Sequence, residues 1–246
     1  MRPFSYRHER LEAFAEYIES ERAAYPDENN NRAAFALESI FRRYRYAYRL
    51  RQIADPLIAQ YQSPPSYANT ERATQQLSPE EMQELADRMH LGNEIQMHFE
   101  SFFLHTSVLC DELAHLLLFF FGDARGIKMS GHRMLSRNID EYLKTKSLSF
   151  DQSLREDAEL LERELCDFRD KQIVHDFNPR KIRALSWSLE TGTVSLAYSG
   201  FLHPKDSDQP VFSKGWDDLI AVMDRHVWRV LGIVKNNREH SRLSVA

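Results

Sequence analysis

Cysteine is scarce in this chain of 246 residues, where Cys110 and Cys166 are the only two. Two cysteines exclude a disulfide scaffold, and we take them to exclude a thiolate zinc site of the usual four-ligand kind as well. We therefore expect a cytoplasmic protein with no metal and no other cofactor. Both cysteines are interpreted as packing residues.

Turn residues and long apolar runs are also few. Eight Gly and nine Pro allow few tight turns, which disfavours an all-β sandwich or barrel. The longest apolar run, Leu116 to Phe121, has six residues, whereas a membrane span needs about 20. Residues 1–11 lack the apolar segment of a signal peptide. The net charge of −5 is not that of a duplex-DNA binder. We expect neither a membrane nor duplex DNA as a partner.

One short segment is nevertheless strongly basic. Residues 41–51 hold five arginines and three tyrosines. Arginines interleaved with aromatic rings can bind phosphates and stack on bases. The segment therefore predicts RNA contacts from Arg42, Arg43, Arg45 and Arg49. The alternative is an amphipathic helix in which the tyrosines pack and the arginines extend into water.

Helical periodicity dominates the rest of the chain. Ser78 and Glu81 are expected to form a capping box that begins one helix, with Pro79 at its first position, and Gly92 is expected to end that helix. Residues 27–31 are expected to be a polar break, and Pro56 to kink or divide a helix. The expected helices are 5–25, 32–61, 79–92, 93–121, 132–146, 149–176 and 216–238.

The helix expected over 93–121 carries the clearest core pattern. Its stripe follows alternating steps of four and three residues and is almost entirely apolar. The members of the stripe are Ile95, Phe99, Phe102, Thr106, Leu109, Leu113, Leu116 and Phe120. The pattern predicts a helix buried in a bundle.

The period changes to two near the C-terminal end. Leu185, Trp187 and Leu189 stand at every second position, and after a turn so do Val194, Leu196 and Tyr198. This pattern predicts a β-hairpin at about 183–199. The predicted fold is mainly α. A helical bundle over 78–246 carries one hairpin and follows an N-terminal helical extension or small lobe over 1–77. No strand–glycine-loop–helix unit occurs, which disfavours nucleotide-binding α/β folds.

A candidate catalytic motif ends the helix expected over 149–176. Arg169 is followed by a polar Asp170, and His175 comes after five intervening residues. This phrase resembles the HEPN superfamily, whose ribonucleases carry Arg, four to six residues and then His. It is also similar to HEPN-like proteins of abortive-infection systems. Here too the motif follows a long apolar helix and an amphipathic one.

The resemblance implies a metal-independent endoribonuclease that cleaves single-stranded RNA in bacterial defence or toxin–antitoxin function. His175 would be the general acid or base, Arg169 would hold the phosphate and Asp170 would orient them. A homodimer and an antitoxin or other partner protein are implied as well. Residues six apart lie about 120° apart around an unbroken helix. The helix must therefore loosen before His175, or two chains must share a site.

Other interpretations remain open at this point. Arg169 could pair with Glu162 or Asp170 while His175 caps its helix, which would fit a non-catalytic HEPN-like module that binds a protein or a nucleotide. Glu112 and His115 match half of a di-iron motif, but the chain contains no second copy. We therefore expect no metal at these positions.

Overall fold

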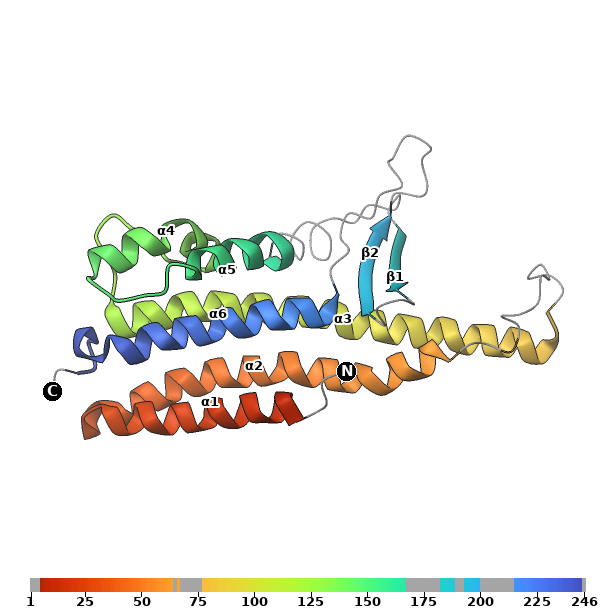
Figure 1. Cartoon of the computed structure of the whole chain (residues 1–246), viewed down its shortest axis with the longest axis horizontal. Coiled ribbons are helices and arrows are strands. Elements are labelled where there is room, and N and C mark those ends of the chain that lie inside the picture. The colour runs from red at the N-terminus through yellow and green to blue at the C-terminus, as the bar shows by residue number, and fades with distance from the viewer. Residues whose placement is uncertain are drawn as a thin grey trace. The chain divides into compact units, whose positions relative to one another are not determined.

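The computed structural model describes residues 5–63, 66, 77–166, 182–188, 193–199 and 215–244, which are mainly helical (Figure 1). The mainly α class predicted from periodicity is therefore confirmed. In chain order the elements are α1 (Ser5–Ala24), α2 (Asp27–Gln62), α3 (Pro79–Phe121), α4 (His132–Thr145), α5 (Leu154–Leu161), the π-helical turn η2 (Glu162–Cys166), β1 (Ile182–Ser188), β2 (Thr193–Ser199), α6 (Trp216–Asn236) and the 3-10 turn η4 (Arg238–His240).

The chain divides into two compact units. Unit 1 comprises Met1–Tyr48, Phe103–Phe177 and Asp218–Ala246, and unit 2 comprises Arg49–Phe102 and Asn178–Asp217. Each unit is described by itself below.

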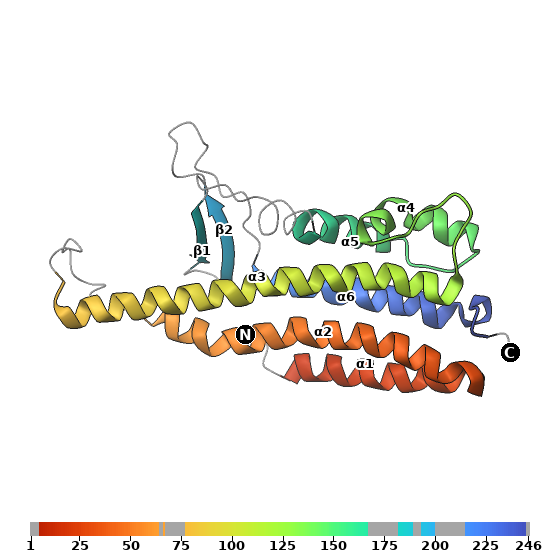
Figure 2. The same ribbon diagram turned by 180° about the vertical axis from the view of Figure 1, so that it is seen from behind.

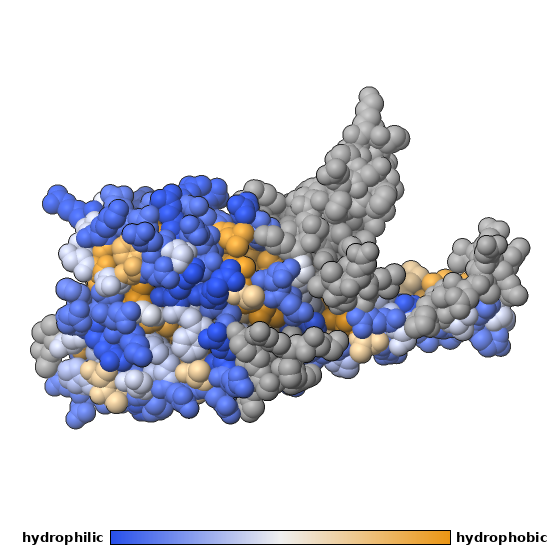
Figure 3. Space-filling model, viewed as in Figure 1, coloured by the Kyte–Doolittle hydropathy of each residue, from blue (hydrophilic) through white to orange (hydrophobic). Residues whose placement is uncertain are grey.

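Unit 1 is a layered helical bundle. Helices α4 and α5 lie on one side of α3 and α6, and α1 and α2 lie on the other side (Figures 1 and 2). Aromatic rings fill the space between α1 and α2, where the Phe14 ring centroid lies 5.3 Å from those of Phe41 and Tyr44. Hydrophilic residues cover most of the bundle surface seen in Figure 3, with hydrophobic residues in narrower seams between them.

The predicted core stripe of α3 is confirmed. All eight members of the stripe are buried, from Ile95 to Phe120. Phe103, Cys110, Leu117 and Phe121, which widen the stripe, are buried too. The helix turns one face inward along this length because an apolar residue recurs at each turn.

Two predicted breaks between helices are wrong, and α5 begins at Leu154 rather than at residue 149. Gly92 does not end a helix, because α3 runs unbroken from Pro79 to Phe121. A glycine inside a helix costs only about 1 kcal/mol relative to alanine, and a Cβ at Gly92 would lie 3.4 Å from the Tyr61 ring. The expected break over 27–31 is the first turn of α2, where Asp27 and Glu28 interact favourably with the helix dipole. Helix α2 also continues through Pro56 without being divided.

The capping box at the start of α3 is confirmed. The Ser78 backbone N–H donates to Glu81 Oε2 over 2.7 Å, and the Glu81 backbone N–H donates to Ser78 Oγ over 3.2 Å. This pair satisfies two backbone donors that the first turn of a helix leaves without intrahelical partners.

Unit 2 also contains a packed aromatic pair and two strands. Trp216 stacks on Phe99 with ring centroids 4.5 Å apart, and Arg51 forms an ion pair of 3.1 Å with Asp217. Strand β1 pairs antiparallel with β2, with Ile182 opposite Ser199 and Ser188 opposite Thr193. The residues that connect the two strands, 189–192, lie outside the described residues.

Within the described residues, α3 is the one helix that is long and apolar enough, by length and composition, to cross a membrane. Its most apolar window is 56% buried inside the protein. The core helix of a globular bundle meets the same criteria, and the buried stripe of α3 agrees with that role.

Candidate functional site

The residues of the predicted catalytic motif, Arg169, Asp170 and His175, lie outside the described residues. The structure does describe the helix that leads toward them. Helix α5 passes at Glu162 into the π-helical turn η2, which ends at the buried Cys166. Only two residues separate Cys166 from Arg169 in the chain.

The predicted RNA-binding arginines do not share one environment. Arg42, Arg45 and Arg49 are exposed on α2. Among the residues that the structure describes, none forms an ion pair with these three. Arg43 instead forms an ion pair of 3.2 Å with Glu112 of α3. Three of the four predicted side chains are thus free to meet a phosphate, and Arg43 already has a carboxylate partner.

The tyrosines of the same segment mostly serve the core, as the alternative interpretation predicts. Tyr44 and Tyr48 are buried, and both hydroxyls donate to Asp224 Oδ1 of α6, Tyr48 over 3.1 Å. Arg10 approaches the other oxygen of Asp224 to 3.3 Å. Tyr46 is different, because it is 48% exposed and stacks on the His105 ring with centroids 5.4 Å apart.

The half-motif of a di-iron site is not completed within the described residues. Glu112 pairs with Arg43, and His115 is exposed on α3. The group of potential metal ligands that the described residues do bring together includes neither of them.

A different cluster lies buried inside unit 1. The Sγ atoms of Cys110 and Cys166 and a ring nitrogen of His132 all lie within 4.8 Å of one another. All three side chains are at most 5% exposed. They come from the C-terminal third of α3, the end of η2 and the first residue of α4. Segments far apart in the chain therefore bring two thiols and an imidazole to one point.

His132 is held in place from two sides. Its Nε2 lies 3.1 Å from the Ala158 carbonyl oxygen of α5, and its backbone N–H donates to Asp111 Oδ1 over 2.8 Å. The preceding Gly131 allows this close approach, because a Cβ there would lie 2.9 Å from the same Asp111 oxygen. The bond from Nε2 leaves Nδ1 buried with no hydrogen-bond partner.

His226 of α6 adjoins this cluster. Its ring centroid lies 5.2 Å from that of His132, with the two rings nearly perpendicular. The side chain is fully buried, and neither ring nitrogen has a hydrogen-bond partner. Each buried polar group without a partner costs about 1–3 kcal/mol. Such groups in a native core require an explanation.

Burial shifts the protonation equilibria of the cluster. It lowers the pKa of His132 to about 4 and lowers the pKa of His226 well below its ordinary value, with His132 and Arg229 adding to the latter shift. The pKa of the Cys110 thiol is raised mainly by the hydrogen bond with Cys166 and, to a smaller extent, by burial. At neutral pH both imidazoles are therefore neutral.

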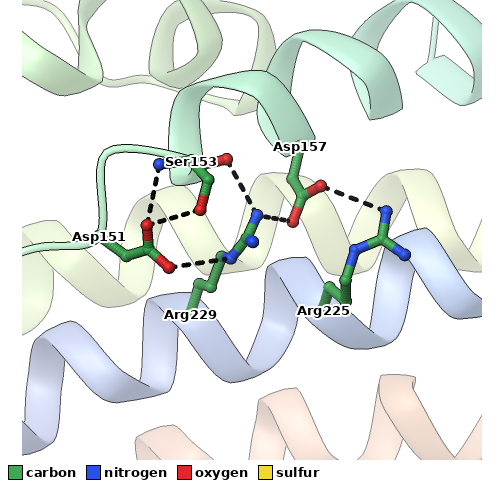
Figure 4. Close-up of polar contacts among 5 residues, drawn as sticks. All are labelled: Asp151, Ser153, Asp157, Arg225 and Arg229. Carbon is green, nitrogen blue, oxygen red and sulfur yellow. Dashed lines mark hydrogen bonds and ion pairs between the residues drawn. The ribbon is translucent and has the colours of Figure 1, made fainter.

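A polar clamp fixes α5 against α6 (Figure 4). The buried Asp157 accepts hydrogen bonds from Arg229 and, over 3.4 Å, from Arg225. Arg229 also donates to the Ser153 carbonyl over 2.9 Å and pairs with Asp151 over 3.4 Å. A buried carboxylate with two cationic partners sets the position of α5, and hence of the η2 turn that follows it.

Sequence reasoning missed the thiol–imidazole cluster. A Cys2His2 set needs only two cysteines, so the low cysteine count does not exclude a four-ligand site. No local spacing reveals these three residues together with the adjoining His226, because the four lie on four separate elements. The usable signal was weak: two cysteines and two histidines at helical positions in an otherwise apolar bundle.

No protein-family model, curated protein or solved structure matches this chain.

Proposed function

We propose that the protein is a HEPN-like endoribonuclease that cleaves single-stranded RNA without a catalytic metal ion. His175 acts as general acid or base, Arg169 holds the scissile phosphate and Asp170 orients the pair. In this proposal the protein is cytoplasmic and serves bacterial defence or a toxin–antitoxin pair. Two copies of the chain form the active unit, and an antitoxin restrains it.

The chemistry requires three groups around one phosphate. A base removes the proton of the ribose 2′-OH, whose oxygen then forms a bond to phosphorus. The bond from phosphorus to the 5′-oxygen breaks, an acid protonates that oxygen, and a cation stabilises the extra charge on the phosphate. Imidazole titrates near neutral pH and can act as base or acid. Guanidinium remains charged and binds phosphate oxygens in pairs.

The observation that carries the proposal is the phrase from Arg169 to His175 placed directly after a packed helix. Leu154, Ala158, Leu161 and Leu165 are buried along α5 and η2. The segment leading into the motif is therefore anchored as far as Cys166, and an anchored support is what a catalytic pair requires.

The exposed face of α2 supplies a second argument for RNA. Arg42 and Arg45 are exposed and Tyr46 presents nearly half of its surface. Charges of this kind bind the sugar–phosphate backbone, and an exposed ring can stack on a base. A molecule of net charge −5 can attract RNA only through such a local surface.

The test is cleavage of a fluorescently labelled single-stranded RNA without added divalent ions, with EDTA added together with the RNA. We expect His175→Ala and Arg169→Ala to reduce cleavage by about 10²–10⁴-fold, the usual contribution of a positioned acid or base. His115→Ala and Arg125→Ala remove the same side-chain types at exposed positions, and both should cleave like the wild type. Circular dichroism verifies that all four variants fold.

Cleavage by His175→Ala at the wild-type rate would reject the catalytic assignment. Fluorescence anisotropy of the same RNA separates the alternative function. Binding without any cleavage, unchanged in His175→Ala, would mean that the protein is a non-catalytic HEPN-like module.

A further inference from the structure

We propose that Cys110, His132, Cys166 and His226 bind one zinc ion as a Cys2His2 site in the core of unit 1. This inference does not depend on the proposed nuclease activity, because a buried ion cannot meet an RNA phosphate. Its role is to hold four segments of the bundle together.

The geometry of the three nearest ligand atoms suits the ion. Zinc binds thiolate sulfur at about 2.3 Å and imidazole nitrogen at about 2.0–2.1 Å, so ligand atoms in a tetrahedral site lie about 3.3–3.8 Å apart. The two sulfurs and the His132 ring nitrogen already lie within 4.8 Å of one another. A small inward movement of side chains completes the contact.

His226 is the fourth ligand. It is not one of the three residues within 4.8 Å, so its ring must turn toward the metal. Its ring already lies against that of His132, and both of its nitrogens are buried without a hydrogen-bond partner. Coordination through one nitrogen gives a use to a polar group that the packing otherwise leaves unsatisfied.

The surroundings of His132 match those of a metal-bound histidine. A ligating imidazole usually donates its second ring N–H to a backbone carbonyl or a carboxylate, which fixes the tautomer. Here Nε2 meets the Ala158 carbonyl over 3.1 Å, and Nδ1 has no partner. The Asp111 carboxylate holds the backbone of the same residue over 2.8 Å.

The ligand chemistry selects zinc. Two soft thiolates and two imidazoles favour a tetrahedral ion of this class over magnesium or calcium, which prefer oxygen. Binding replaces two S–H bonds by two S–Zn bonds and releases two protons to solvent, while both imidazoles enter as neutral ligands. No electron is transferred. The π-helical turn that ends at Cys166 agrees with this role, since such turns occur frequently at functional sites.

The first test is the metal content of the full chain, purified without a histidine tag. We expect one zinc per chain by elemental mass spectrometry. After removal of zinc under reducing conditions, added Co²⁺ should give the visible d–d bands of tetrahedral cobalt and a thiolate charge-transfer band whose intensity corresponds to two sulfurs. A chain that contains no zinc and gives no such bands with Co²⁺ overturns the proposal.

The second test uses substitutions of the ligands. Loss of a group that only orients a metal ligand weakens metal binding by about 10–100-fold. We expect Cys166→Ser and His226→Gln to weaken Co²⁺ binding by more than that. His105→Gln changes a histidine of the same helix as Cys110 outside the cluster, and it should bind Co²⁺ like the wild type. Unchanged affinity in His226→Gln, or an unchanged charge-transfer band in Cys166→Ser, contradicts the four-residue set.

Two measurements on the wild-type protein test the zinc site even if the ligand variants do not fold. If a ligand variant does not fold, the wild-type cobalt spectrum still counts the thiolates. Alkylation of the native protein followed by mass spectrometry shows whether Cys110 and Cys166 are protected until a chelator is added, as zinc requires. A disulfide between them in freshly purified protein would refute the zinc site.

Discussion

At the scale of single residues, burial decides what the titratable side chains of this bundle can do. Glu21 is fully buried, yet both of its oxygens are bound by Arg238, over 3.0 and 2.5 Å. His226 has no comparable partner among the described residues. A buried charge can be stable when hydrogen bonds replace its hydration. A buried imidazole with no partner instead requires an explanation, which the proposed zinc ion would supply.

His105 provides a residue-scale prediction. Burial lowers its pKa below the ordinary value of 6.5, and the charge of Arg43 lowers it further. Its stack with Tyr46 supplies part of that burial. We expect the pKa of His105 to rise in Tyr46→Ala and, by less, in Arg43→Met. NMR titration of the ring signals measures both shifts.

The sign follows from proton binding. Because the folded-state pKa of His105 is depressed, its contribution to stability is present above the unfolded-state value and is lost as the pH falls through the folded-state pKa. Arg137→Met on α4 is the control and should leave the His105 titration unchanged. An equal or larger shift in Arg43→Met than in Tyr46→Ala would contradict burial as the main cause.

At the scale of elements, the ends of helices are set by contacts that propensity does not encode. Helix α4 begins at His132 because Asp111 of α3 accepts its backbone N–H. Helix α5 is fixed by the clamp between Asp157 and two arginines of α6 (Figure 4). Both contacts hold segments that carry members of the thiol–imidazole cluster.

Two glycine substitutions should change stability in opposite directions. Gly131→Ala places a Cβ 2.9 Å from Asp111 Oδ1, and the displaced backbone should destabilise the fold by about 1–3 kcal/mol. Gly232→Ala meets nothing within 4 Å inside α6, so it should stabilise the fold by about 0.5–1 kcal/mol. Urea denaturation of the two variants measures the difference. Destabilisation by Gly232→Ala, or none by Gly131→Ala, would show that the local packing differs from that described.

At the scale of the whole molecule, charge is distributed unevenly. The chain carries −5 overall, yet Arg42 and Arg45 stand exposed on α2 without an ion-pair partner in the described part of the chain. Any polyanion that binds this protein must therefore do so through a restricted surface. That condition can be tested whether or not the protein cleaves RNA.

RNA affinity should depend on salt through these arginines. If each contacts a phosphate, Arg42→Ala and Arg45→Ala should each reduce the slope of log affinity against log salt by about 1. Arg137→Ala, which removes an exposed arginine of α4, is the matched control and should keep the wild-type slope. Anisotropy titrations at several salt concentrations measure the slopes. Equal slopes for Arg42→Ala, Arg45→Ala and Arg137→Ala would show that these arginines of α2 do not contact the RNA.

Part of the fold could be predicted because its causes are local. The stripe from Ile95 to Phe120 and the capping box of Ser78 and Glu81 follow from residues within one or two turns of each other. The boundaries at Gly92 and at residues 27–31 were wrong, since a glycine or a polar run only weakens a helix. Tyr44 and Tyr48 were placed in the core by one of the two interpretations of their segment, and they are buried there.

The sequence by itself determined which faces of the helices are apolar, because a side chain's direction repeats every 3.6 residues along its own helix. It also offered the pair Arg169 and His175 as a motif, which lies outside the described residues. Only the tertiary structure decided that Cys110, His132 and Cys166 meet and that His226 lies against them. Periodicity specifies that a face is buried, whereas which faces touch, and at what height along each helix, depends on packing between segments distant in the chain.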